Sequence, residues 1–75
     1  MELTLSQLRP GERAVVRQVG TDGPMGRRFL DLGLIAGTPV ECLGRSPWGD
    51  PSAYAIRGAV IALRARDCAG VLVEP

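Results

Sequence analysis

The sequence predicts a mainly β fold, a small and strongly bent antiparallel barrel of about five strands with one inserted α-helix. Short runs rich in valine, isoleucine and alanine alternate with glycine and proline turns, which is the pattern of antiparallel strands. Helical periodicity is clear in a single segment, and 75 residues suffice for one small core. Residues 1–75 are therefore expected to form a single domain in which barrel closure hides the strand edges.

The N-terminal segment predicts a capped turn followed by a strand. Leucines at positions 3, 5 and 8 surround Ser6, which suits a short strand or a helical turn near residues 6–9 with Ser6 as the cap. Pro10 and Gly11 then mark a turn. Residues 12–19 place valines among arginines, and this β-branched content predicts a strand although the alternation is imperfect.

A helix is expected over about residues 24–32. Pro24 suits its first position, where the missing amide proton has no partner to lose. Met25, Phe29 and Leu32 follow the i, i+4, i+7 spacing of one apolar face. The charged side chains of this segment point elsewhere, which predicts an amphipathic helix with one side against the core.

Glycine and proline end this helix and begin the next strand. Gly33 falls where a helix C-terminus enters the left-handed region, and Leu34 follows where the accompanying hydrophobic contact is made. Gly37 allows a corner, and Pro39 suits the first residue of a strand because it cannot donate a ladder hydrogen bond. The stretch from residue 27 to residue 41 therefore predicts a helix stop, a corner and a strand.

The rest of the chain predicts a β-hairpin between two turns, followed by a short closing strand. The first turn takes its structural residues from Gly49, Asp50 and Pro51, and Gly58 joins the two arms of the hairpin. The expected ranges are 39–45, 53–57 and 59–64 for strands, 66–69 for a helical turn, and 71–73 for the last strand.

Composition argues against several functional classes. The formal net charge is +1, without the basic excess that a nucleic-acid-binding domain usually carries. The N-terminus lacks the pattern of a signal peptide, and no run approaches the ~20 apolar residues of a membrane span, so a cytoplasmic protein is expected. Cys42 and Cys68 lie far apart without a CxxC pair, which predicts two partly buried thiols in a reducing compartment.

The sequence offers no catalytic or metal-binding constellation, and no cofactor is expected. It has no histidine, no GxSxG motif, and no lysine for a phosphate-binding GxxxxGK[ST] loop. Asp31, Asp50 and Asp67 are better explained as helix and turn residues than as an acid–base set. The glutamates are scattered without the spacing of a hard-cation site. We therefore predict a protein that is not an enzyme.

A surface for a partner is then the expected functional feature, and its candidate contact residues are Met25, Arg27, Arg28, Asp31 and Trp48. An arginine pair can fork onto carboxylates or phosphates of another protein, although two exposed arginines equally serve to solvate a helix. Trp48 either anchors an interface or covers an open end of the barrel. The sequence leaves both alternatives open for each feature.

The order of three motifs resembles the FeoA family. The motifs are RFLDLGLIAGTPV at residues 28–40, PWGDP at residues 47–51 and IALR at residues 61–64. Each motif alone is weak, but the three in this order are specific, and the similarity runs from about residue 5 to residue 73. One departure is Ala36, since family members usually carry proline before the glycine of the corner.

The resemblance implies an SH3-like barrel that serves bacterial ferrous iron uptake as an accessory protein. The implied partner is FeoB, a membrane protein with a cytosolic GTP-binding domain, which this chain would bind and modulate without transporting iron itself. The protein would then lie in the cytoplasm, with peripheral attachment to the inner membrane through that partner. A metal-responsive regulatory module and a small nucleic-acid-binding barrel are the alternatives, and weak self-association is left open.

Overall fold

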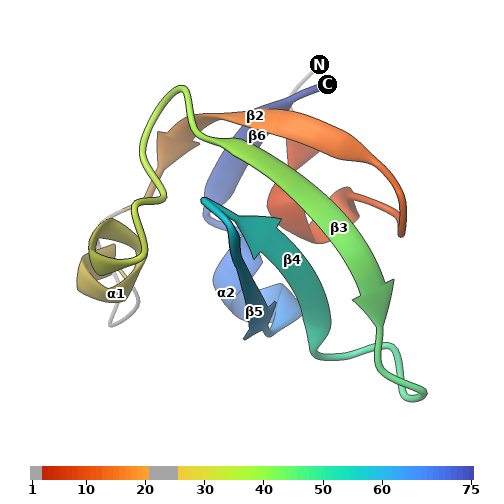
Figure 1. Ribbon diagram of the computed structural model, residues 1–75. Helices are drawn as coiled ribbons and strands as arrows, with labels where there is room; N and C mark the ends of the chain where they lie inside the picture. The colour runs from red at the N-terminus through yellow and green to blue at the C-terminus, as the bar shows by residue number, and fades with distance from the viewer. Residues whose placement is uncertain (1–2, 21–25) are drawn as a thin grey trace.

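One strongly curved antiparallel sheet organises the computed structural model, which describes residues 3–20 and 26–75 (Figure 1). The strands lie in the order β1-β6-β2-β3-β4-β5. Their bounds are β1 (Leu3–Thr4), β2 (Arg13–Val19), β3 (Pro39–Arg45), β4 (Ser52–Ile56), β5 (Ala59–Leu63) and β6 (Val71–Glu74). The helical segments are the 3-10 turn η1 (Leu5–Gln7) and the helices α1 (Gly26–Asp31) and α2 (Ala65–Cys68). The first and last strands, β1 and β6, lie side by side as a pair (Figure 1).

The mainly β prediction is confirmed, and the N-terminus differs from it in two details. The leucine-rich segment forms both a strand and a helical turn, and the turn begins at Leu5 rather than near residue 6. Its cap is Thr4 and not Ser6, because Thr4 has extended backbone and its amide donates to Gln7 Oε1 at 2.8 Å. The Ser6 hydroxyl lies inside the turn, 2.7 Å from the Thr4 hydroxyl.

Alternating side chains of the curved sheet fill a small apolar core. In β4, Tyr54 and Ile56 point inward while Ala53 and Ala55 point outward, which is the expected period of two. The segments η1 and α2 pack against each other (Figure 1), and the Tyr54 hydroxyl donates to the Leu5 carbonyl at 3.4 Å. The buried apolar residues are Leu5, Leu8, Ala14, Val16, Phe29, Leu34, Val40, Cys42, Tyr54, Ile56, Leu63, Cys68, Val71 and Val73.

Helix α1 ends in a glycine-stopped motif. Gly33 has a φ of 78°, its amide donates to the Leu30 carbonyl at 2.9 Å, and the Leu34 amide donates to the Phe29 carbonyl at 2.9 Å. These two bonds and the burial of both Phe29 and Leu34 define a Schellman motif. Pro24 and Met25, the first two residues of the expected helix, lie outside the described residues.

Hydrogen bonds join the corner after α1 to strand β2 and to the end of α1. Gly37 has a φ of 94° and donates to the Val16 carbonyl at 2.7 Å, while the Val16 amide donates to the Thr38 carbonyl at 2.8 Å. The Thr38 hydroxyl donates to the Gly33 carbonyl at 2.9 Å and accepts the Ile35 amide at 3.2 Å. This buried threonine therefore joins the end of α1 to the start of β3, a role that the sequence analysis missed.

A tight turn connects β4 to β5, as the hairpin pattern predicts. Arg57 and Gly58 occupy it with φ values of 51° and 81°, and Ile56 faces Ala59 across the base. Two successive left-handed residues give the type I′ geometry that matches the twist of a hairpin. The sheet order leaves β5 at one end, so the expectation that barrel closure hides every strand edge is wrong for this strand.

Candidate functional site

The exposed side of α1 carries most of the predicted contact residues. Arg27, Arg28 and Asp31 are exposed, and two apolar side chains accompany them, Leu30 at 53% and Ile35 at 48% exposure. These five residues are called the α1 face below. Another candidate contact, at position 25, lies outside the described residues.

Trp48 lies in the loop between β3 and β4, at the opposite end of the domain from α1 (Figure 1). Its side chain is 88% exposed, so it does not cover an end of the barrel. The loop is held in place by Asp50, whose Oδ1 accepts the Ala65 amide at the start of α2 at 2.8 Å. The structure therefore does not bring Trp48 and the arginines of α1 together on one surface.

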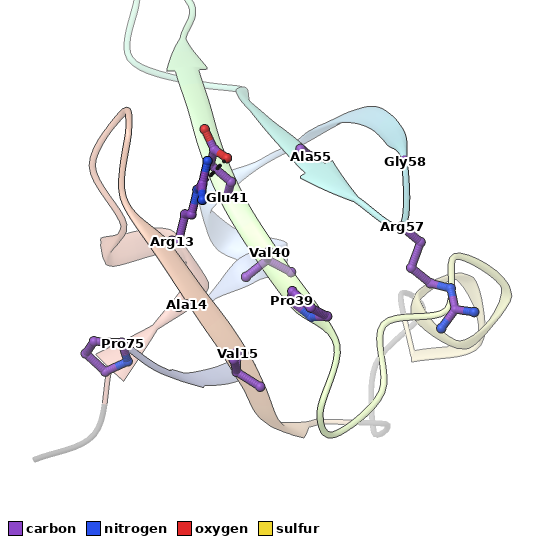
Figure 2. Close-up of a pocket in the computed structure, with 10 residues that line it drawn as sticks. All are labelled: Arg13, Ala14, Val15, Pro39, Val40, Glu41, Ala55, Arg57, Gly58 and Pro75. Atoms are coloured by element: carbon purple, nitrogen blue, oxygen red, sulfur yellow. Dashed lines mark hydrogen bonds and ion pairs between the residues drawn. The ribbon is translucent and has the colours of Figure 1, made fainter.

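An open groove of about 540 Å³ crosses the outward-facing side of β2, β3 and β4 (Figure 2). Its floor is apolar, with Val15, Pro39 and Ala55 contributed by three adjacent strands. On one side Arg13 Nε lies 3.0 Å from Glu41 Oε1, because the register of β2 and β3 places these residues opposite each other. Sequence reasoning missed this groove, since the pairing of strands distant in sequence was not readable.

Arg57 connects this groove to the C-terminal end of α1. The side chain leaves the β4–β5 turn and extends towards α1 (Figure 2). It passes over Gly33, where an added Cβ would lie 2.8 Å from Arg57 Nε. Glycine is therefore required at position 33 for two reasons: it tolerates the left-handed backbone, and its lack of a side chain leaves room for Arg57. The guanidinium therefore lies beside the C-terminal end of α1, an end that favours positive charge.

A second hollow of about 520 Å³ lies on the outward-facing side of β3, β4 and β5. Its apolar side chains on these strands are Leu43, Ala53, Val60 and Ala62, and Val60 is 70% exposed. The loop that carries Trp48 borders this hollow through residues on either side of the tryptophan. We call these four residues the apolar sheet face.

The part of the chain that the structure describes contains two buried thiols and no group of side chains that could hold a metal ion. Among residues 3–20 and 26–75, no three His, Cys, Asp or Glu side chains converge as metal ligands would. Cys42 and Cys68 are free and fully buried rather than partly buried as expected. Burial raises the pKa of the Cys68 thiol to about 11 and raises the pKa of Tyr54 well above its usual value. Neutral thiols are poor nucleophiles and poor metal ligands.

No helix within residues 3–20 and 26–75 has the length and apolar character needed to cross a membrane. α1 spans six residues and α2 four, which are short connectors between strands.

Comparison with known proteins identifies relatives in both sequence and fold. The chain is 32% identical over 72 residues to the Fe(2+) transport protein A/Fe(2+) transporter FeoB fusion protein of Porphyromonas gingivalis, a match that spans 96% of this chain and 8% of that protein. It superimposes on the solution structure of iron(II) transport protein A from Clostridium thermocellum with a TM-score of 0.88, at 29% identity, over 96% of this chain and 44% of that one. The crystal structure of Stenotrophomonas maltophilia FeoA complexed with zinc gives a TM-score of 0.84 at 29% identity, over 96% and 89% of the two chains.

The family model agrees with these relatives. The model of the FeoA domain matches residues 3–75, which includes every described strand and helix. The fold is that of the SH3-like FeoA structures, with α1 inserted between β2 and β3. This chain belongs to the FeoA domain family.

Proposed function

We propose that this chain is a non-enzymatic accessory protein of ferrous iron uptake that binds and modulates the cytosolic GTP-binding domain of a FeoB-type transporter. The observation that carries the proposal is the Porphyromonas gingivalis relative, whose name joins Fe(2+) transport protein A and transporter FeoB in one fusion protein. Fusion holds two partners at a high effective concentration, which is useful when they act together. Acting together also requires a binding surface on this domain for the transporter domain.

The α1 face is proposed as the principal contact. Arg27 and Arg28 are exposed and have the planar, forked donors that match carboxylates and phosphates. Leu30 and Ile35 beside them are about half exposed, at 53% and 48%. Arginines around exposed apolar side chains are the composition found at the energetic centres of protein interfaces. Isolated exposed charges contribute little, so the apolar pair is expected to add to the affinity that the two arginines supply.

The Trp48 loop is proposed as a second, independent contact. Its tryptophan is 88% exposed and the loop is anchored to α2 through Asp50, so an anchored loop presents an aromatic side chain to solvent. Tryptophan is enriched among residues that dominate binding energy. Because the loop and α1 lie at opposite ends of the domain (Figure 1), substitutions in the two should have additive effects on affinity.

Calorimetric titration of the purified chain into the cytosolic domain of the FeoB-type transporter of its own organism tests this function. The domain is loaded with GDP or with a non-hydrolysable GTP analogue. We expect saturable binding in at least one nucleotide state. Arg27→Glu with Arg28→Glu should weaken it about tenfold or more, because two attractive charges become repulsive.

The matched control makes the same charge change at another exposed pair, Arg64→Glu with Arg66→Glu near α2. This control should bind like the unsubstituted chain. Equal weakening by both double variants would assign binding to net charge and contradict the α1 face. Absence of binding at high micromolar concentration in both nucleotide states would overturn the proposed function.

A further inference from the structure

β5 lies at one edge of the sheet, and the hairpin geometry fixes which of its backbone groups point away from β4. Because Ile56 and Ala59 flank a two-residue turn, they form a hydrogen-bonded pair, and such pairs alternate along antiparallel strands. Ile61 and Leu63 therefore bond to β4. The amides and carbonyls of Val60 and Ala62 point away from it. In the described part of the chain, neither backbone has a partner in another strand or loop.

The open edge lacks the features by which proteins usually protect such strands. Its sequence is Ala-Val-Ile-Ala-Leu, with no charge and no proline, and its pairing with β4 is regular over all five residues. The other edge of the sheet, β1, has two residues in the part of the chain that the structure describes, and short edges present little to a partner. β5 also carries Val60, whose side chain is 70% exposed. This edge is therefore suited to accept another strand.

We propose that β5 pairs antiparallel with β5 of a second copy of this chain, around a two-fold axis at Ile61. In that register Val60 lies opposite the partner's Ala62, and the outward amide and carbonyl of each residue meet their complements. A two-fold arrangement repeats the same bonds on both sides of the axis. The partly exposed Ile61 then packs against its own copy, in a close non-hydrogen-bonded pair.

A second copy fits this edge better than a charged partner strand, because the five residues of β5 carry no charge for recognition. Identical uncharged strands meet without repulsion, and Val60 covers apolar surface of the partner while its own is covered. The apolar sheet faces of the two copies become continuous across the new ladder. Five residues give an interface at the small end of the range, so the dimer is weak and its population depends on concentration.

Hydrogen exchange measured by NMR tests the pairing without any substitution. Between about 10 µM and about 1 mM protein, the amides of Val60 and Ala62 should become protected while those of Ile61 and Leu63 stay unchanged. Sedimentation should show a rising mass over the same range. A monomer at every concentration would overturn the proposal. So would protection of these amides only after addition of a FeoB-type cytosolic domain, which would assign the edge to that partner.

Charge exchange at position 60 tests the register. Positions 60 of the two copies are diagonal neighbours across the axis, so Val60→Lys and Val60→Glu should each remain monomeric because like charges meet. An equal mixture of the two variants should dimerise. Val15→Lys, at an exposed valine on the inner strand β2, is the control and should dimerise like the unsubstituted chain. Dimers of Val60→Lys alone, or a mixture that stays monomeric, would contradict the proposed pairing.

Discussion

Replacing Thr38 by valine tests how the corner between α1 and β3 is held. Valine has nearly the shape of threonine but lacks the hydroxyl, which bonds the Gly33 carbonyl at 2.9 Å and the Ile35 amide at 3.2 Å. The threonine is only 4% exposed, so water does not readily replace these bonds in the folded state. The substitution should therefore destabilise the domain without changing the packing of the corner.

The magnitude follows from the bonds that remain. The Ile35 amide also donates to the Gly33 carbonyl at 3.1 Å, so neither group is left wholly unpaired and the full desolvation penalty is not expected. Loss of both hydroxyl bonds, at about 1 kcal/mol each, lowers the free energy of unfolding by about 2 kcal/mol. For a domain of this size that corresponds to a fall in Tm of about 8–16 °C.

Urea unfolding followed by circular dichroism measures the change, and the slope m should stay constant. Thr38→Ser is the control, because it keeps the hydroxyl and loses one methyl group, at a cost of about 1 kcal/mol. The valine variant should be the less stable of the two. The reasoning is refuted if valine changes stability by less than about 0.5 kcal/mol, or if serine is the more damaging substitution.

Three further predictions concern the loop, the corner glycines and the buried thiol. Asp50→Ala should cost about 1 kcal/mol in urea unfolding because it removes the acceptor for the first amide of α2, whereas Asp50→Asn should retain most of the stability. Gly33→Ala and Gly37→Ala should each lower the free energy of unfolding by about 1–2 kcal/mol, because both glycines have left-handed backbone. The loss should be larger at Gly33, where the new methyl group meets Arg57, and this excess should disappear in an Arg57→Ala background. An equal cost at both sites would contradict the contact with Arg57. The free energy of unfolding should decline as pH rises above 9. The reason is that the thiol of Cys68 loses its proton at a pKa of 9.0 in the unfolded chain but at a pKa of about 11 in the folded domain. Below pH 9 the thiol is protonated in both states, and its stabilising contribution is fully present. Cys68→Ala should flatten the decline between pH 9 and 10, and an unchanged slope would argue against burial of that thiol as its cause.

Local sequence predicted which residues are exposed at the candidate site but not how they are grouped. Helical spacing predicts that Arg27 and Arg28 avoid the core, and the proline-glycine loop predicts an irregular segment around Trp48. Whether these features share one surface depends on the path of the strands between them. The structure separates them (Figure 1) and places Arg57, which no motif indicated, against the end of α1.

The sequence alone determined the type and approximate limits of the elements, because helix periodicity, β-branched runs and glycine or proline stops act through neighbours in the chain. The tertiary structure decided the strand order and register, which depend on contacts between distant segments. That order leaves β5 at an edge, aligns Arg13 with Glu41, and brings Asp50 to the start of α2. These contacts join residues that are distant in the sequence, so the spacing of residues along the chain does not predict them. The surfaces proposed for binding depend on these contacts.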